Sequence, residues 1–162
     1  MARADYFLKI EGVDGESTDD KHKGEIEILS YSLGGTNAGS GAAGGGSGQG
    51  KVDLHDFSFV KKVDKSSAKL FAAMCSGHHY GTATLTCRRA GKEQQEYLTV
   101  ALSQVFVSSF TQLGNDADET IPSDSVTLNF VKIEVKYKEQ KEDGSLGGEV
   151  IGGWDGKANK VI

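Results

Sequence analysis

The chain has 162 residues with a formal net charge of -5, and it contains 22 glycines, one proline and two cysteines. This length predicts one domain, residues 1–162, with a sizeable core. The mildly acidic charge, without a basic block, argues against a surface that binds nucleic acid or anionic membranes. Two cysteines are too few for a disulfide framework, so Cys75 and Cys87 are both expected to be buried thiols.

The N-terminal segment MARADYFLKIEG has no apolar core of the kind that marks a secretory signal. No apolar run approaches the roughly 18 residues of a membrane span. We therefore expect a protein that is made soluble in the cytoplasm, without membrane insertion. If it leaves the cell, it leaves by a route that reads no cleavable signal.

Alternating apolar residues predict strands along most of the chain. The first is YFLKIEGV, in which Tyr6, Leu8 and Ile10 share one face. TATLTC predicts a shorter strand further along the chain. The long segment YLTVALSQVFVSSF predicts a strand that keeps its apolar residues in step, namely Leu98, Val100, Leu102, Phe106 and Phe110.

Three further strands change the parity of their apolar residues partway along. They are EIEILSYSLG, KVDLHDFSFV and VTLNFVKIEVKY. Because side chains alternate between the two faces of a strand, such a change requires a bulge or a bend. Long, bent strands are typical of a closed barrel or of a sandwich whose strands turn corners.

The segment DKSSAKLFAAMCSG predicts one helix, with Asp64 or Ser66 as N-cap and Gly77 at its end. Its predicted apolar stripe consists of Leu70, Phe71, Met74 and Cys75. Its other face is small and weakly polar, and carries Lys69, Ala72, Ala73 and Ser76. Two interpretations stay open: the helix plugs one end of a barrel, or its small face lines a surface shared with neighbouring copies.

The segment from Gly34 to Gly50 is predicted to be a flexible, extended loop, because nine of its 17 residues are glycine. Gly45, Gly50 and Lys51 also match the spacing of a phosphate-binding loop. That site requires a strand before it, a helix after it, and Ser or Thr after the lysine. Here a strand follows and Val52 takes the place of the hydroxyl residue, so we attribute the match to glycine density.

Other candidate chemistry is equally weak. His78 and His79 lie near Cys75 and Cys87, but adjacent histidines diverge, and no second cluster completes four zinc ligands. Paired carboxylates such as Asp19–Asp20 and Asp116–Asp118 fall in polar loops and are expected to be solvated. No serine lies in a nucleophile turn. We therefore predict no catalytic residue, no metal and no cofactor.

Several segments, in order, resemble the haemolysin-coregulated protein family, Hcp. They are FLKIEGVDGES, KVDLHDFSFVKKVDKSSAKLFAAMCSGHHY, EYLTVALSQVFVSS and VTLNFVKIEVKY. The resemblance covers nearly the whole chain, including the glycine-rich loop and Gly153–Trp154. It implies a compact β-barrel of two sheets with one α-helix alongside, similar to phage tail-tube proteins.

The resemblance also implies a structural protein of the bacterial type VI secretion system. Six copies form a ring, rings stack head-to-tail into an inner tube, and the lumen carries effector proteins. Spike and sheath components of the machine are the other implied partners. Secretion by this machine agrees with the absence of a signal segment.

The site residues implied in this way fall in two groups. The ring-stacking candidates are Gly44, Gly45, Gly46, Ser47, Gly48, Gln49, Gly50 and Lys51. The candidates for the lumen or for the seam between subunits are Ser32, Lys69, Ala72, Ala73 and Ser76. Two alternative functions remain: a small-ligand-binding β-barrel, which needs a closed apolar cavity, and a nucleotide-dependent enzyme that binds phosphate at residues 45–51.

Overall fold

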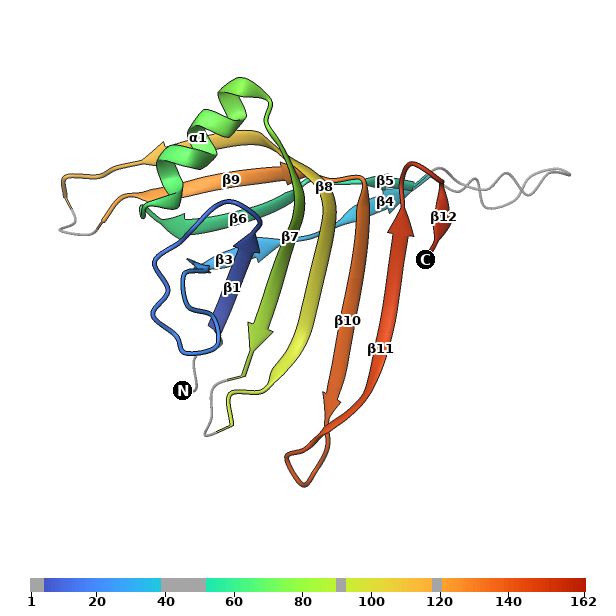
Figure 1. Cartoon of the computed structure of the whole chain (residues 1–162). Coiled ribbons are helices and arrows are strands. Elements are labelled where there is room, and N and C mark those ends of the chain that lie inside the picture. The colour runs from blue at the N-terminus through green and yellow to red at the C-terminus, as the bar shows by residue number, and fades with distance from the viewer. Residues whose placement is uncertain (1–4, 39–51, 90–92, 118–120) are drawn as a thin grey trace, which may run out of the picture.

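The computed structural model describes residues 5–38, 52–89, 93–117 and 121–162 (Figure 1). Within them the chain is mainly β, with one helix, α1 (Ser66–Ser76). In the described part of the chain, no helix has the length and apolar character needed to cross a membrane. The strands are β1 (Asp5–Ile10), β2 (Ile26–Ile28), β3 (Ser30–Ser32), β4 (Gly35–Asn37), β5 (Val52–Leu54), β6 (Phe57–Lys62), β7 (His79–Arg88), β8 (Glu96–Leu113), β9 (Ser123–Asn129), β10 (Lys132–Gln140), β11 (Leu146–Asp155) and β12 (Lys160–Val161).

Ten strands form one sheet, and β4 and β5 form a separate two-stranded sheet. The large sheet runs in the order β12-β11-β10-β8-β7-β1-β2, and a second series of pairings leads from β8 through β9 and β6 to β3. We call β1, β2, β7, β10, β11 and residues 96–103 the upright layer. The arm layer consists of β3, β6, β9 and residues 105–113, and its strands run across the upright strands (Figure 1).

This arrangement confirms a mainly β fold with two sheets and one helix. The pairings do not show the closed barrel predicted from the sequence, and the second sheet is only the β4–β5 hairpin. The hairpin takes Gly35–Asn37 out of the segment predicted to be a flexible loop, so that prediction was wrong at its start. The reason is that β4 finds a partner in β5, whose backbone satisfies its hydrogen-bonding groups.

Each predicted change of parity marks the place where a segment changes its sheet partner. In the first, β2 pairs with β1, and β3, which begins two residues later, pairs with β6. In the second, β5 pairs with β4 and β6 pairs with β9. In the third, β9 belongs to the arm layer and β10 to the upright layer. Each segment therefore changes partner where a bend was predicted, but it forms two separate strands rather than the one long strand predicted.

β8 also changes its parity, which the sequence pattern did not predict. Leu102 and Val105 are both buried, whereas Phe106 and Phe110 are only half-buried. Gln104 lies between the two buried residues with a φ of 53°, in the left-handed region. This local turn lets one strand belong to both layers: β8 pairs with β10 before Gln104 and with β9 after it, while β7 pairs with β8 on both sides of the turn.

The core lies between the two layers and beneath α1. Its buried apolar residues include Leu8, Ile26, Phe57, Phe59, Leu85 and Leu128. The helix contributes Leu70 and Ala73, whereas Phe71 and Cys75 of the predicted stripe are exposed. Ser66 and Ser67 are buried instead, because they form hydrogen bonds with Asp64 and Lys61. The buried face of the helix is therefore rotated relative to the predicted apolar stripe. The prediction that both cysteines are buried was right for Cys87 and wrong for Cys75.

Candidate functional site

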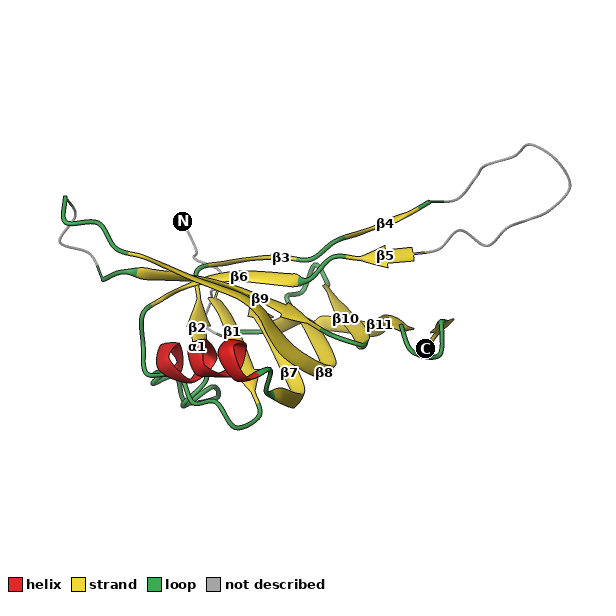
Figure 2. Ribbon diagram, turned by 90° about the horizontal axis from the view of Figure 1, so that it is seen from above, coloured by secondary structure: helices red, strands yellow, loops and turns green. Residues whose placement is uncertain are grey.

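The outward face of the arm layer is lined by hydroxyl groups. Strand pairing aligns Ser32, Ser58, Thr127 and Ser109 in one row across four strands. The next row contains Ser30, Val60, Ser125 and Thr111. Ser123 adds an eighth hydroxyl on the same parity of β9. In Figure 2 the arm layer forms one side of the molecule, and α1 and β1 lie on its other side.

The hydroxyl face has little charge in its interior. Among the described residues of these strands, charged side chains of this parity are confined to the two ends of β6, at Asp56 and Lys62. Thr127 Oγ1 lies 2.7 Å from Ser108 Oγ and 2.5 Å from Ser109 Oγ. The Ser108 hydroxyl also donates to Asp56. Neutral groups that bond to one another give a smooth, polar surface with no strong preference for the charge of a partner.

The inward face of the same layer carries a buried ion pair. Lys61 and Asp124 are both 0% exposed, and Lys61 Nζ donates to Asp124 Oδ2 at 2.7 Å. The ammonium also donates to Ser67 at 2.8 Å and to Asp64 at 3.0 Å, which ties the start of α1 to β6 and β9. Burial raises the pKa of Asp124, but hydrogen bonds from Lys61, Ser67 and Gln112 outweigh it, so the pKa is lowered.

The two predicted N-caps both take part at the start of the helix, although neither is the cap residue. The cap position is Lys65, which makes no capping hydrogen bond with its side chain. Asp64 Oδ1 accepts a hydrogen bond from the Ser66 amide at 2.8 Å. The carboxylate therefore satisfies one of the free amides at the helix start from one residue further back.

The predicted lumen and seam residues occupy two separate places. Ser32 is exposed and belongs to the hydroxyl face. Lys69, Ala72, Ala73 and Ser76 all line a shallow pocket of about 350 Å³ beside the helix, together with Glu11, Gly12, His78 and Tyr80. Ala73 was predicted to lie on the exposed small face, but it is only 4% exposed. It packs into the core, because the small side chain lets the helix approach the sheet.

The predicted ring-stacking residues, Gly44 to Lys51, lie outside the described residues. The structure does describe what flanks them, which is the β4–β5 hairpin (Figure 2). β5 begins at Val52, so a strand rather than a helix follows Lys51, as the argument against a phosphate site required. The hairpin projects away from the two layers in Figure 2.

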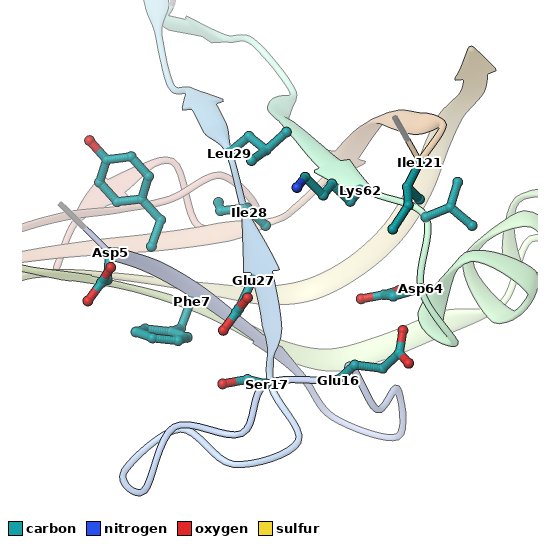
Figure 3. Close-up of a pocket in the computed structure, with 12 residues that line it drawn as sticks. Asp5, Phe7, Glu16, Ser17, Glu27, Ile28, Leu29, Lys62, Asp64 and Ile121 are labelled. Atoms are coloured by element: carbon teal, nitrogen blue, oxygen red, sulfur yellow. The ribbon is translucent and has the colours of Figure 1, made fainter. Parts of the chain in front are cut away.

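A pocket of about 400 Å³ lies between β1, β2 and the connection from β6 to α1 (Figure 3). Figure 3 shows the carboxylates of Glu16, Glu27 and Asp64 on one side, and Lys62 with Leu29 and Ile121 on the other. Two of these carboxylates already have partners. Glu16 accepts from the Lys65 amide at 3.1 Å, and Asp64 accepts from Lys61.

Another ionic cluster fastens the β1–β2 connection to the upright layer. Arg88 is 2% exposed and donates to both carboxylate oxygens of Asp19, at 3.0 and 2.7 Å, and to Asp5 at 3.1 Å. The hydrogen bond from Arg88 lowers the pKa of Asp19 to about 2. The expectation that Asp19 is simply solvated was therefore wrong.

The predicted metal and nucleophile candidates are not assembled into a centre. His78 and His79 are exposed and pack on Tyr80 and Phe106. Within the described residues, no group of three histidine, cysteine or acidic residues has the arrangement of a metal site. Burial raises the pKa of the Cys87 thiol, which is unfavourable for a nucleophile.

Comparison with known proteins places the fold. A family model described as "Type VI secretion system effector, Hcp" matches residues 7–137. A Pseudomonas aeruginosa protein named hcp1 is 45% identical over 157 residues, with 96% of each chain covered. The crystal structure of Hcp1 from Salmonella typhimurium is 34% identical, with a TM-score of 0.80 and 100% of both chains covered. A structure described as a type six secretion system protein is 28% identical, with a TM-score of 0.92 over 99% of this chain and 100% of that one.

These matches define a protein of the type VI secretion system with a mainly β fold. The family model covers most of the chain, and the P. aeruginosa relative spans almost all of it. The chain therefore belongs to the Hcp family of type VI secretion system effectors. The resemblance inferred from the sequence segments is confirmed.

Proposed function

We propose that this chain is a structural tube subunit that forms six-membered rings, and that the hydroxyl face lines the lumen of each ring. The observation that supports this most is the pair of hydroxyl rows across β3, β6, β9 and β8. A channel that carries effector proteins of different charge is best served by a polar wall without fixed charges in its interior. The proposed role is structural rather than catalytic.

The distribution of exposed apolar side chains supports a head-to-tail contact between copies. Phe71 of α1 and Leu113 at the end of β8 are 51% and 70% exposed. Val150 and Ile151 of β11 are 67% and 52% exposed. Both views place α1 and β11 at opposite sides of the molecule (Figures 1 and 2). A contact that joins unlike surfaces can close into a ring by rotation.

Ring stacking is proposed to use residues 44–51, which lie outside the described residues; the β4–β5 hairpin on either side of them projects away from the two layers (Figure 2). A barrel-like closure is also proposed, since the amide of Leu29, which lies between β2 and β3, donates to the Val60 carbonyl of β6 at 2.7 Å. The fold would then resemble a tail-tube subunit. The protein would be made in the cytoplasm and expelled with the spike when the sheath contracts.

Native mass spectrometry and negative-stain microscopy of the full chain test the assembly. Six-membered rings are the expected result, and a monomer at micromolar concentration would contradict the proposal. Ala72→Glu tests the seam, because Ala72 is exposed on α1 and lines the pocket beside the helix. Loss of rings in this variant would assign the helix face to the seam between subunits. Intact rings would show that the helix face is not part of the seam. Lys69→Gln serves as a smaller change in the same pocket.

The position of the hydroxyl face is tested by labelling. In a Cys75→Ser background, Ser125→Cys should react with a small maleimide in assembled rings but be protected from a large polyethylene glycol maleimide. Asp143→Cys, in an exposed turn, provides the control that reacts with both reagents. Equal reaction of Ser125→Cys with the large reagent in intact rings would show that this face is not in the lumen.

Ligand binding is a second candidate, supported by one groove. Tyr6, Tyr31, Leu33, Leu98 and Val135 line a space of about 590 Å³ at the end of the core. A saturable apolar ligand bound by the monomer would favour this function. The nucleotide alternative is tested by ATP binding and its loss in Lys51→Ala.

A further inference from the structure

His22 is a buried histidine held between two carboxylates. It is 6% exposed, and it belongs to the connection between β1 and β2. Its Nδ1 lies 2.7 Å from Glu25 Oε2, and its Nε2 lies 2.6 Å from Glu96 Oε1. Glu25 belongs to the same connection, whereas Glu96 begins β8, so the imidazole joins two distant parts of the chain.

The two contacts together specify the protonation of the ring. A carboxylate accepts hydrogen bonds, and a neutral imidazole has only one N–H to donate. With two carboxylates at hydrogen-bonding distance, one ring nitrogen of a neutral His22 would turn its lone pair toward a negative charge. The geometry is satisfied when both nitrogens carry a proton and the ring is an imidazolium.

The groups around the ring favour this charge. The ring of His22 stacks on Phe7 of β1 at 4.4 Å, and the Arg88 guanidinium of β7 lies 4.8 Å from the same phenyl ring. Four carboxylates surround this stack: Glu25 and Asp19 on the β1–β2 connection, Asp5 on β1, and Glu96 on β8. A second cation beside Arg88 reduces this excess of negative charge.

The β1–β2 connection is itself tightly built. The Ser17 amide donates to the Glu25 carbonyl at 3.1 Å, and the Gly24 amide donates to the Ser17 carbonyl at 2.8 Å. At Gly15 a Cβ atom would lie 2.4 Å from the Glu25 carbonyl oxygen, so the two sides of the connection approach as closely as glycine allows. These bonds close the connection on itself, and its attachments to the body hold it in this form.

These attachments differ in their response to protons. The Arg88–Asp19 pair keeps its charge over the neutral and alkaline range, because the pKa of Asp19 is lowered and that of Arg88 is raised by their mutual hydrogen bonds. The Lys65 amide that donates to Glu16 does not titrate. The contact from His22 to Glu96 depends on a ring proton.

We propose that protonated His22 is a pH-sensitive attachment that holds the β1–β2 connection against the start of β8. Loss of its ring proton as the pH rises weakens this attachment. The sign follows from the partners. The charged ring gains two hydrogen bonds in the folded chain, so the attachment is present at lower pH and is lost as the pH rises through deprotonation of the folded state. This inference does not depend on ring formation.

Nuclear magnetic resonance of the full chain tests the protonation directly. In spectra that correlate ring nitrogens with ring protons, His22 should show two protonated nitrogens at neutral pH, whereas exposed His78 provides the internal reference. Amide exchange of Ser17 and Gly24 reports the docking. Their protection factors should fall by roughly tenfold or more as His22 deprotonates, which is the effect of losing a charged hydrogen bond.

Two variants distinguish the specific contact between His22 and Glu96 from a general effect of charge. Glu96→Gln removes one charged acceptor, so His22 should deprotonate at lower pH and the fall in protection should move with it. Glu93→Gln makes the same change of charge nearby, on a side chain that bonds only to Gln95 among the described residues, and should leave both midpoints unchanged. His22→Gln should give Ser17 and Gly24, at every pH, the low protection that the wild type shows only after His22 deprotonates, and so remove the pH dependence.

Either of two results would overturn the proposal. One is a His22 ring with a single protonated nitrogen at neutral pH and the midpoint of His78. The other is an equal pH dependence of Ser17 and Gly24 protection in the wild type and in His22→Gln. The second measurement remains informative if Glu96→Gln does not fold.

Discussion

The upright layer and the arm layer present opposite chemistry on their outward faces. On β10 and β11 that face carries ion pairs, between Lys132 and Asp155, Lys136 and Glu134, and Lys138 and Glu149. The arm layer presents hydroxyls in the corresponding positions of its strands. Both faces are accessible in a single chain, so exposure alone does not explain the difference. It is explained if the two faces meet different surroundings once the chain is assembled.

The two layers also differ in how each is anchored. The arm layer depends on Lys61 and Asp124, which lie deep in the molecule and have no exposure. The upright layer depends on Arg88 and Asp19, and the Asp19 side chain is 18% exposed. A pair that water cannot reach is costly to break, because the remaining charge stays buried, whereas a partly exposed carboxylate can be solvated. This difference predicts the order of the effects below.

Lys61→Met should give the largest loss. It leaves Asp124 buried with only Ser67 and Gln112 as donors, and should lower the free energy of unfolding by about 3–5 kcal/mol. Urea unfolding, followed by fluorescence, measures this. The matched control is Lys62→Met, the exposed neighbour, which should change stability by less than about 0.5 kcal/mol. The double variant Lys61→Met/Asp124→Leu should recover part of the loss, and no recovery would mean that packing rather than charge decides the effect.

Asp19→Asn should cost less, and its effect should depend on pH. Since its hydrogen bond with Arg88 lowers the pKa of Asp19 to about 2, this carboxylate stabilises the fold above its ordinary pKa near 4. The contribution, about 1–2 kcal/mol, should disappear as the pH falls from 4 toward 2. Urea unfolding of both proteins between pH 2 and pH 6 should show the curves converge at the acid end. Parallel curves would exclude a role for Asp19 ionisation.

Much of the fold could be predicted because the signals were local. The parity changes in EIEILSYSLG, KVDLHDFSFV and VTLNFVKIEVKY reported the bends directly, since burial switches faces where the partner changes. The bend in β8 was hidden, because Phe106 and Phe110 continue the apolar pattern while Val105 and Val107 are the residues that become buried. Closure of a barrel depends on contacts between distant strands, which a linear pattern does not contain.

The candidate site was predicted only in part. Ser32 was chosen from the polar parity of its strand, but the hydroxyl face depends on the register between strands, and register joins residues as distant as Ser58 and Thr127. The sequence nevertheless contained a signal for the buried ion pair beneath this face. Lys61 continues the buried parity of Phe57 and Phe59, which marks it as a lysine that needs a buried partner.

Thr127→Val tests whether the hydroxyls on the arm layer stabilise one another. The change keeps the shape and removes the contacts with Ser108 and Ser109, so we expect a loss of about 0.5–1 kcal/mol. Thr111→Val is the control, since the described residues provide no hydrogen-bond partner for the Thr111 side chain. Equal stability of the two variants would mean that contacts among these hydroxyls do not stabilise the fold, and that the hydroxyl face acts through contacts outside the chain.

Glu134→Gln on the upright layer should have the smallest effect. Glu134 and Lys136 are 36% and 40% exposed and 3.2 Å apart, and an exposed ion pair of this kind contributes about 0–0.5 kcal/mol. Urea unfolding at low and high salt should therefore show little difference from the wild type in the isolated chain. A clear loss of rings in Glu134→Gln with unchanged chain stability would show that this face contacts another copy rather than solvent. Unchanged rings and stability would leave the charged face toward solvent and the hydroxyl face toward the lumen.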